Sequence, residues 1–145
     1  MTIQYRKATS ADAAVCAKIL GDWFEATPFV PRIHTRAEDL AFLNWVIENQ
    51  TVYVAENGSV VGFLAREAEE INLLYLDPEV RGQAIGKALI ALAKEETSHL
   101  SLWTFQDNQS ARRFYEREGF RPIAFTDGAD NEEKTPDVKY EWRLS

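Results

Sequence analysis

The stretch "INLLYLDPEVRGQAIGKALIALAKE", residues 71–95, contains a strand, a loop and a helix in succession. Residues 71–76 are almost all apolar, which is typical of a strand that is covered on both faces. Asp77 and Pro78 interrupt this apolar run. From residue 85 onward the apolar side chains recur at helical spacing, which predicts an amphipathic helix.

The loop in this stretch contains two glycines, Gly82 and Gly86, and two cations, Arg81 and Lys87. The first turn of a helix presents unpaired backbone N–H groups and the positive end of the helix dipole. A strand–loop–helix junction of small residues therefore favours an anion, and phosphate is the usual ligand. Glycine lets the backbone approach the ligand closely, and the cations add charge.

Two familiar phosphate-binding loops do not match this junction. A Walker A loop has four residues between its first glycine and Gly-Lys-Ser/Thr, whereas three residues separate Gly82 from Gly86. Ala88 also occupies the position of the magnesium-binding hydroxyl. A dinucleotide-binding fingerprint requires Gly-x-Gly-x-x-Gly early in a repeated βαβ fold, and the sequence has neither feature.

The remaining pattern predicts one domain over residues 1–145. Strands are expected at residues 3–7, 51–56, 59–66, 71–76, 99–105, 120–126 and 138–144. Helices are expected after a cap at Thr9 or Ser10, after a capping box at Thr35, after the loop described above and after residues 107–110. The order β-α-α-β-β-β-α-β-α-β-β predicts a mixed α/β sheet with helices on both faces.

Composition excludes several classes of protein. The net charge of −7 opposes binding to a phosphate backbone, so we expect no nucleic-acid partner. There is no apolar run of about 18 residues and no signal-peptide core, so we expect no membrane association and a cytoplasmic protein. Only Cys16, His34 and His99 supply soft metal ligands, and they form no motif, so no metal is expected.

Two segments resemble the GNAT superfamily of N-acetyltransferases. "LYLDPEVRGQAIGKALI" resembles its acyl-CoA loop, Arg/Gln-x-x-Gly-x-Gly/Ala, which falls on residues 81–86. "NQSARRFYEREGF", residues 108–120, is similar to the family segment Asn-x-x-Ala-x-x-Phe-Tyr-x-x-x-Gly-Phe. The order of elements also agrees, so the resemblance covers essentially the whole chain. It implies an α/β fold of the α+β kind: a mixed, mostly antiparallel twisted sheet of six or seven strands, a central splayed parallel pair, and helices on both faces.

The resemblance implies that acetyl-CoA is the acyl donor. Its pantetheine arm would lie as a pseudo-strand beside the main chain of the strand at residues 71–76, and its pyrophosphate would bind the loop that follows. The implied donor-binding residues are Leu74, Tyr75, Leu76, Arg81, Gly82, Gln83, Ala84, Ile85, Gly86, Lys87 and Asn108.

Ala84 departs from the family pattern, which usually has glycine at this position. An α-region conformation would accommodate its methyl group, and Ala84→Gly would then slightly lower stability through chain entropy. A methyl group that crowds the pyrophosphate would instead weaken CoA binding.

The resemblance places Tyr115 beside the thioester sulfur, as the acid that assists the leaving thiolate. A core aromatic next to Phe114 is the alternative. Many family members carry a glutamate as base at the position of Asn72, which cannot usefully accept a proton. A regular pleat places Glu70 on the same strand face, about 6.6 Å away, so Glu70 is the candidate base. Glu69, Glu25 and a chain of water molecules are the alternative candidates for the base.

By resemblance, residues 23–34 and 126–137 flank the acceptor pocket. Trp23, Phe29 and His34 are the candidate substrate-binding residues, although aromatic residues at a helix end also serve as core. Packing is the role assigned to the other tryptophans, Trp103 among them. The second segment carries four acids that would attract a cationic acceptor, or would form a solvated turn: Asp127, Asp130, Glu132 and Glu133.

The favoured function is transfer of an acetyl group from acetyl-CoA to a primary amine, with a small cationic molecule as acceptor. The alternatives are a peptide or protein N-terminal acetyltransferase and a non-catalytic acyl-CoA-binding module. A shallow open cleft would favour a peptide, and a pocket closed by residues 28–34 would favour a small molecule. The sequence does not fix the oligomeric state, so a homodimer stays open.

Overall fold

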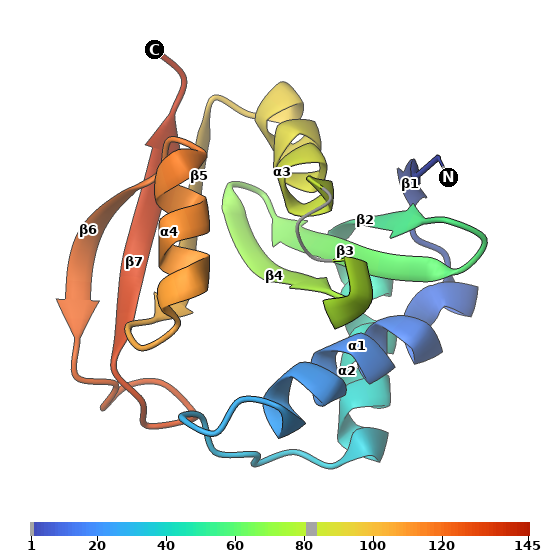
Figure 1. The fold of residues 1–145 in the computed structure, drawn as a ribbon, viewed down its shortest axis with the longest axis horizontal. Helices are drawn as coiled ribbons and strands as arrows, with labels where there is room; N and C mark the ends of the chain where they lie inside the picture. The colour runs from blue at the N-terminus through green and yellow to red at the C-terminus, as the bar shows by residue number, and fades with distance from the viewer. Residues whose placement is uncertain (1, 81–83) are drawn as a thin grey trace.

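A computed structural model describes residues 2–80 and 84–145 of the chain (Figure 1). Its strands form one seven-stranded sheet in the order β1-β2-β3-β4-β5-β7-β6. The strands are β1 (Gln4–Lys7), β2 (Thr51–Glu56), β3 (Val60–Glu67), β4 (Glu70–Leu76), β5 (His99–Phe105), β6 (Arg121–Thr126) and β7 (Asp137–Arg143). The α-helices are α1 (Ala13–Glu25), α2 (Arg36–Asn49), α3 (Ile85–Glu96) and α4 (Gln109–Arg117).

The sheet confirms the fold class expected from the sequence. Its neighbouring strands pair antiparallel except β4 and β5, which are parallel in the described part of the chain. The helix α3 provides the crossover between these two strands, as parallel neighbours require. In Figure 1, α1 and α2 lie on one side of the sheet and α3 and α4 on the other.

Each face of the sheet has its own hydrophobic core, because strand side chains alternate between faces. Leu89 of α3 and Leu102 of β5 belong to the core under α3 and α4. Leu20 of α1, Leu43 of α2 and Phe63 of β3 belong to the core on the opposite face. Each such side chain contributes about 1.5–3 kcal/mol by leaving water.

The N-terminal caps decide where the first two helices begin. Thr35 Oγ1 accepts from Glu38 N at 3.1 Å, and Glu38 Oε1 accepts from Thr35 N at 2.8 Å, which confirms the predicted capping box of α2. The cap expected at Thr9 or Ser10 instead starts a short 3-10 turn, and α1 begins only at Ala13. None of the described helices has the length and apolar character needed to cross a membrane.

Candidate active site

The parallel strands β4 and β5 separate shortly after they meet. Their register contains only Glu70 opposite Ser101 and Ile71 opposite Leu102. Beyond this point β4 stays paired with β3 as far as Leu76, while β5 stays paired with β7. Each strand is therefore held by its outer neighbour, and a cavity of about 610 Å³ opens between them.

Elements from both faces of the sheet line this cavity. Ile85 and Gly86 of α3 and Phe114 of α4 come from one face, and Trp23 of α1 comes from the other. The gap between the strands therefore connects the two faces. All three strand residues implied for donor binding line it: Leu74, Tyr75 and Leu76.

The N-terminus of α3 opens onto one end of the cavity. Its first i to i+4 hydrogen bond runs from Ala88 N to Ala84 O at 3.1 Å. The N–H groups of Ile85, Gly86 and Lys87 precede that bond and have no carbonyl partner within the helix. These residues and Ala84 line the cavity, and the Lys87 side chain is exposed. The remaining members of the predicted loop, Arg81, Gly82 and Gln83, lie outside the described residues.

Ala84 does not take the α-region conformation that would suit its methyl group. It caps α3 with φ 61° and ψ 17°, in the left-handed region. This conformation costs an alanine about 1–2 kcal/mol, and glycine adopts it freely. The α-region alternative is therefore wrong, and we expect the strain at this position to outweigh the entropy of the unfolded chain.

Gly86 has a packing role that its place in the loop did not indicate. A Cβ atom at this position would lie 3.1 Å from Cζ of Phe114. The absence of a side chain therefore allows the first turn of α3 to pack against α4. This contact brings the N-termini of both helices to the same cavity.

Asn108 joins the cavity through the cap of α4. Its Oδ1 accepts from Ala111 N at 3.3 Å and from Ser110 Oγ at 3.3 Å. Its side-chain amide N–H groups have no partner within residues 2–80 and 84–145, and Asn108 lines the cavity. The cap fixes the side chain and leaves two donors for a ligand.

Tyr115 lies with its ring in the core and its hydroxyl at the cavity. The ring is 8% exposed and contacts Phe114 and Phe120 at centroid distances of 5.2 and 5.7 Å. The Tyr115 hydroxyl has no hydrogen-bond partner in the described part of the chain. It is nevertheless not fully buried, because Arg66 Nε is the only fully buried side-chain polar atom without a partner there. The hydroxyl therefore reaches the open space of the cavity that Tyr115 lines. Burial raises the pKa of its phenol above the ordinary value, so the group stays protonated at neutral pH.

Glu70, the candidate base, does not line the cavity. It is exposed and lies at the end where β4 and β5 are still paired. The expected regular pleat between Glu70 and Asn72 is interrupted, because Ala65 pairs with Leu73 and Arg66 with Ile71, which leaves Asn72 as the extra residue of a bulge. Asn72 itself lines the cavity.

The other carboxylates considered as bases are engaged elsewhere. Glu69 lies 3.5 Å from His99, and Glu25 pairs with Arg36 at 2.7 Å. These contacts direct the two carboxylates toward other side chains. Neither residue lines the cavity.

Trp23, a candidate substrate-binding residue, lies near the end of α1 and lines the cavity. Its ring makes an edge contact with Tyr75 at 5.4 Å and stacks on Phe105 at 6.4 Å. Tyr75 thus stands in an aromatic group on the face opposite Tyr115. Burial is the main cause that raises the pKa of the Tyr75 phenol, with smaller effects from Tyr115 and Glu133.

Phe29 and His34 are not brought to this cavity. Phe29 is half-buried in the loop between α1 and α2. His34 Nε2 contacts the carboxylate of Glu132, which lies 98 positions later in the chain. This contact raises the pKa of the His34 imidazole. In Figure 1 the two loops meet near the bottom of the view, so the pair ties the α1–α2 loop to the β6–β7 loop.

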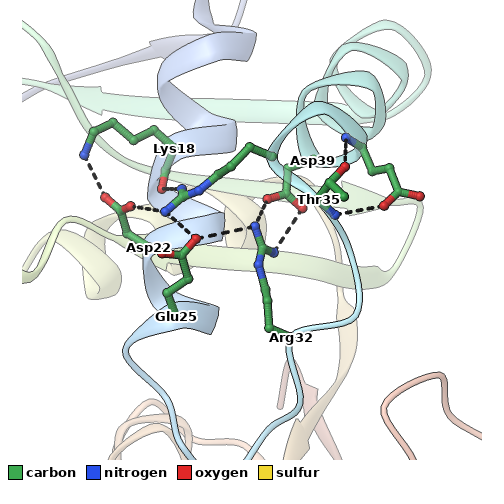
Figure 2. Close-up of polar contacts among 8 residues, drawn as sticks. Lys18, Asp22, Glu25, Arg32, Thr35 and Asp39 are labelled. Atoms are coloured by element: carbon green, nitrogen blue, oxygen red, sulfur yellow. Dashed lines mark hydrogen bonds and ion pairs between the residues drawn. The ribbon is translucent and has the colours of Figure 1, made fainter.

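An ion-pair network holds the α1–α2 loop against both helices (Figure 2). Arg32 Nη2 lies 2.6 Å from Oδ2 of the buried Asp39 in α2 and 4.0 Å from Glu25 in α1.

The same network also joins the two helices directly. Asp22 of α1 accepts from Lys18 Nζ at 2.7 Å and from Nη2 of Arg36 in α2 at 2.9 Å. The network fixes the segment that carries Trp23 and His34.

A second cavity of about 480 Å³ adjoins the first. The two share Trp103, Thr104 and Phe105 of β5. Trp103 is 43% exposed, so the sequence-based assignment of this residue to packing is wrong. Alternation along β5 could have indicated it, because Trp103 and Phe105 fall on the strand face opposite the buried Leu100 and Leu102.

The acetyltransferase (GNAT) domain family matches residues 48–122, which is just over half of the chain. This range contains the splayed strands, the N-terminus of α3 and all of α4. The chain belongs to the GNAT acetyltransferase family.

Several individual proteins are similar to the chain. Over 70 residues it is 36% identical to peptidyl-lysine N-acetyltransferase YjaB of Salmonella typhimurium; the match covers 48% of either protein, so the chain spans about half the length of this relative. The solution structure of apo-form YjaB from Escherichia coli has a TM-score of 0.81 at 22% identity, over 100% of both chains. A GNAT superfamily phosphinothricin acetyltransferase from Sinorhizobium meliloti, in complex with AcCoA, has a TM-score of 0.79 at 18% identity, over 100% of this chain and 90% of that one. These structural similarities show the fold.

Proposed function

We propose that the chain is an acetyl-CoA-dependent N-acetyltransferase that acts on a primary alkylamine. The observation that carries this proposal is the cavity between β4 and β5, which has the N-terminus of α3 at one end and the Tyr115 hydroxyl on its wall. Family membership supports it, as does the similarity to a structure in complex with AcCoA.

The donor would bind by two kinds of contact. The free edge of β4 beyond Ile71 offers main-chain groups that no longer pair with β5, so an extended pantetheine arm can hydrogen-bond there. The N–H groups of Ile85, Gly86 and Lys87, together with the Lys87 ammonium, would bind the pyrophosphate. The free amide of Asn108 adds two donors along the same wall.

The chemistry requires an uncharged amine and a stabilised leaving group. The amine nitrogen attacks the thioester carbonyl carbon, the C–S bond breaks, and the thiolate leaves with a proton that originated on nitrogen. A thiolate, with a thiol pKa of about 8.5, is a weaker base than phenolate, so full proton transfer from Tyr115 is uphill. Tyr115 would therefore hydrogen-bond the developing negative charge on sulfur, which favours the transition state over the bound donor.

The acceptor is proposed to be a small cationic amine. Asp130 and Glu133 of the β6–β7 loop line the second cavity, where their charges would favour a cation. A peptide lysine is the second candidate, because a relative is named a peptidyl-lysine N-acetyltransferase and a lysine side chain presents the same narrow primary amine.

The proposal is tested by thiol release from acetyl-CoA in the presence of four acceptors. These are 1,4-diaminobutane, a lysine-containing tetrapeptide with a blocked N-terminus, a lysine-free tetrapeptide with a free N-terminus, and buffer alone. Amine-dependent thiol release is expected, with the highest kcat/KM for the diamine. Higher kcat/KM for either peptide would replace the small acceptor by that peptide group. Calorimetric binding of acetyl-CoA without thiol release in any mixture would identify a non-catalytic acyl-CoA-binding module.

A further inference from the structure

The second cavity lies where an acceptor could reach the thioester. It shares Trp103, Thr104 and Phe105 with the donor cavity, so the two spaces adjoin along the part of β5 that has left β4. Its remaining wall comes mainly from the segment between β6 and β7. A molecule in this space would approach the donor cavity from the side opposite α3 and α4.

Asp130 and Glu133 both line this wall; Asp130 is exposed, so Glu133 is the better enclosed of the two carboxylates. Its side chain is half-buried, and within residues 2–80 and 84–145 its carboxylate has no hydrogen-bond or ion-pair partner. Asp137, in the same wall, is 9% exposed and accepts from Thr126 Oγ1 and from Asn131 Nδ2. Asp137 is therefore satisfied within the fold, whereas Glu133 is available to a ligand.

Glu133 also lies within electrostatic reach of the donor cavity. The phenol of Tyr75, which lines that cavity, has its pKa raised mainly by burial and further by Tyr115 and Glu133. Tyr115 and the Glu133 carboxylate therefore both act on the Tyr75 phenol electrostatically. Trp103 and Phe105 contribute aromatic surface to the cavity that Glu133 also lines.

We propose that Glu133 binds the ammonium group of the acceptor in the second cavity and accepts its proton before acetyl transfer. This inference rests on the N-acetyltransferase function proposed above. It assigns the base that the sequence placed at Glu70. A carboxylate in this position holds a cationic amine by its charge and selects against neutral molecules, so it determines both specificity and reactivity.

The protons balance in this scheme. The ammonium nitrogen gives one proton to the Glu133 carboxylate, and its lone pair then forms the bond to the thioester carbonyl carbon. The second nitrogen proton leaves when the C–S bond breaks and ends on the CoA thiol, with Tyr115 hydrogen-bonded to the sulfur. Glu133 returns its proton to solvent, so each turnover yields an amide, CoA thiol and one proton.

The test compares Glu133→Gln with wild type on two acceptors at pH 7.5. The first is 1,4-diaminobutane, which is charged, and the second is aniline, which is uncharged. Loss of a general base predicts a fall of about 100-fold in kcat/KM for the diamine. The rate with aniline is expected to stay within threefold, because aniline has no proton to give before attack. Glu48→Gln, an exposed charge-matched change on α2, is the control and should leave both rates unchanged.

A pH profile provides a second readout, which also applies if aniline is turned over too slowly. In Glu133→Gln, kcat/KM for the diamine should rise about tenfold per pH unit, because only amine that is already uncharged in solution can react. In wild type kcat/KM should rise less steeply.

An unchanged rate with the diamine in Glu133→Gln, or an equal loss with both acceptors, overturns the inference while leaving the function intact. Absence of turnover by wild type with every acceptor overturns the proposed function itself.

Discussion

The rings of Tyr115 and Tyr140 lie 6.2 Å apart in one core, yet their hydroxyls differ in environment. Tyr140 Oη donates to Glu116 Oε2 at 2.6 Å and accepts from Arg112 Nε at 3.1 Å. The Tyr115 hydroxyl has no partner in the described part of the chain and opens onto the cavity between β4 and β5. One phenol is fixed by the fold, and the other is left for a ligand.

Removal of the Tyr115 hydroxyl tests its role in catalysis. Tyr115→Phe keeps the buried ring and its packing, so acetyl-CoA affinity measured by calorimetry should change by less than threefold. The kcat is expected to fall about 10²–10⁴-fold, because the developing thiolate loses its hydrogen bond. Tyr140→Phe is the matched control: it should lower stability and leave kcat within threefold. Wild-type turnover in Tyr115→Phe would make Tyr115 a core aromatic only.

Charge reversal at Lys87 tests the anion site at the N-terminus of α3. Lys87→Glu should weaken CoA binding by about 1.5–3 kcal/mol, the usual size of a hydrogen bond to a charged group. Binding of pantetheine, which lacks the phosphates, should stay the same. Lys7→Glu, on the edge strand β1, changes the net charge by the same amount away from the cavity, so it controls for the change in the overall electrostatic field. Equal weakening of CoA and pantetheine would show that Lys87 does not contact the phosphates.

Ala84→Gly should stabilise the protein. Glycine relieves the left-handed conformation, worth about 1–2 kcal/mol, and loses about 0.4–1 kcal/mol to chain entropy. The free energy of unfolding in urea is therefore expected to rise by about 0.5–1 kcal/mol, and CoA affinity to stay within a few fold. Ala88→Gly, in the interior of α3, should instead lower the free energy of unfolding by about 0.5–1 kcal/mol. A loss of stability in Ala84→Gly as well would contradict the strain at this position.

The pair of His34 and Glu132 should make the loop contact depend on pH. The hydrogen bond to Glu132 raises the pKa of His34 in the folded protein. Its stabilising effect is therefore complete below the ordinary histidine pKa of about 6.5 and disappears as the pH rises through the raised value. NMR titration of the ring protons should give a lower His34 pKa in Glu132→Gln than in wild type, while Glu48→Gln has no effect. An identical His34 titration in wild type and Glu132→Gln would exclude the contact in solution.

The buried end of the loop network depends on Arg32. Arg32→Leu leaves the Asp39 carboxylate buried without its partner, so the free energy of unfolding should fall by about 3 kcal/mol. Adding Asp39→Asn removes the unpaired charge and should recover part of this loss. Urea denaturation of the single and double variants measures the difference. A double variant less stable than Arg32→Leu alone would show that an unpaired Asp39 charge is not what destabilises the single variant.

Local pattern was enough to predict most of the fold. Alternation identified the strands, the Thr35 capping box located the start of α2, and the small residues after residue 76 predicted the start of α3. These features are set by interactions between residues close in sequence, so their signals survive in the sequence itself. The family motifs singled out Asn108 and Tyr115, and both line the cavity between β4 and β5.

The acceptor side was decided only by the tertiary structure. Glu70 and Asn72 were related by assuming a regular strand, but a bulge set by pairing with β3 interrupts it. The contact of His34 with Glu132, and the cavity that Trp103 and Glu133 both line, bring together segments far apart in sequence. Such contacts depend on how two independently formed loops are placed by the sheet, and no local pattern encodes that placement. The sequence therefore indicated which residues meet at the cavity between β4 and β5, whereas only the fold placed Glu133 in the wall of the adjoining cavity.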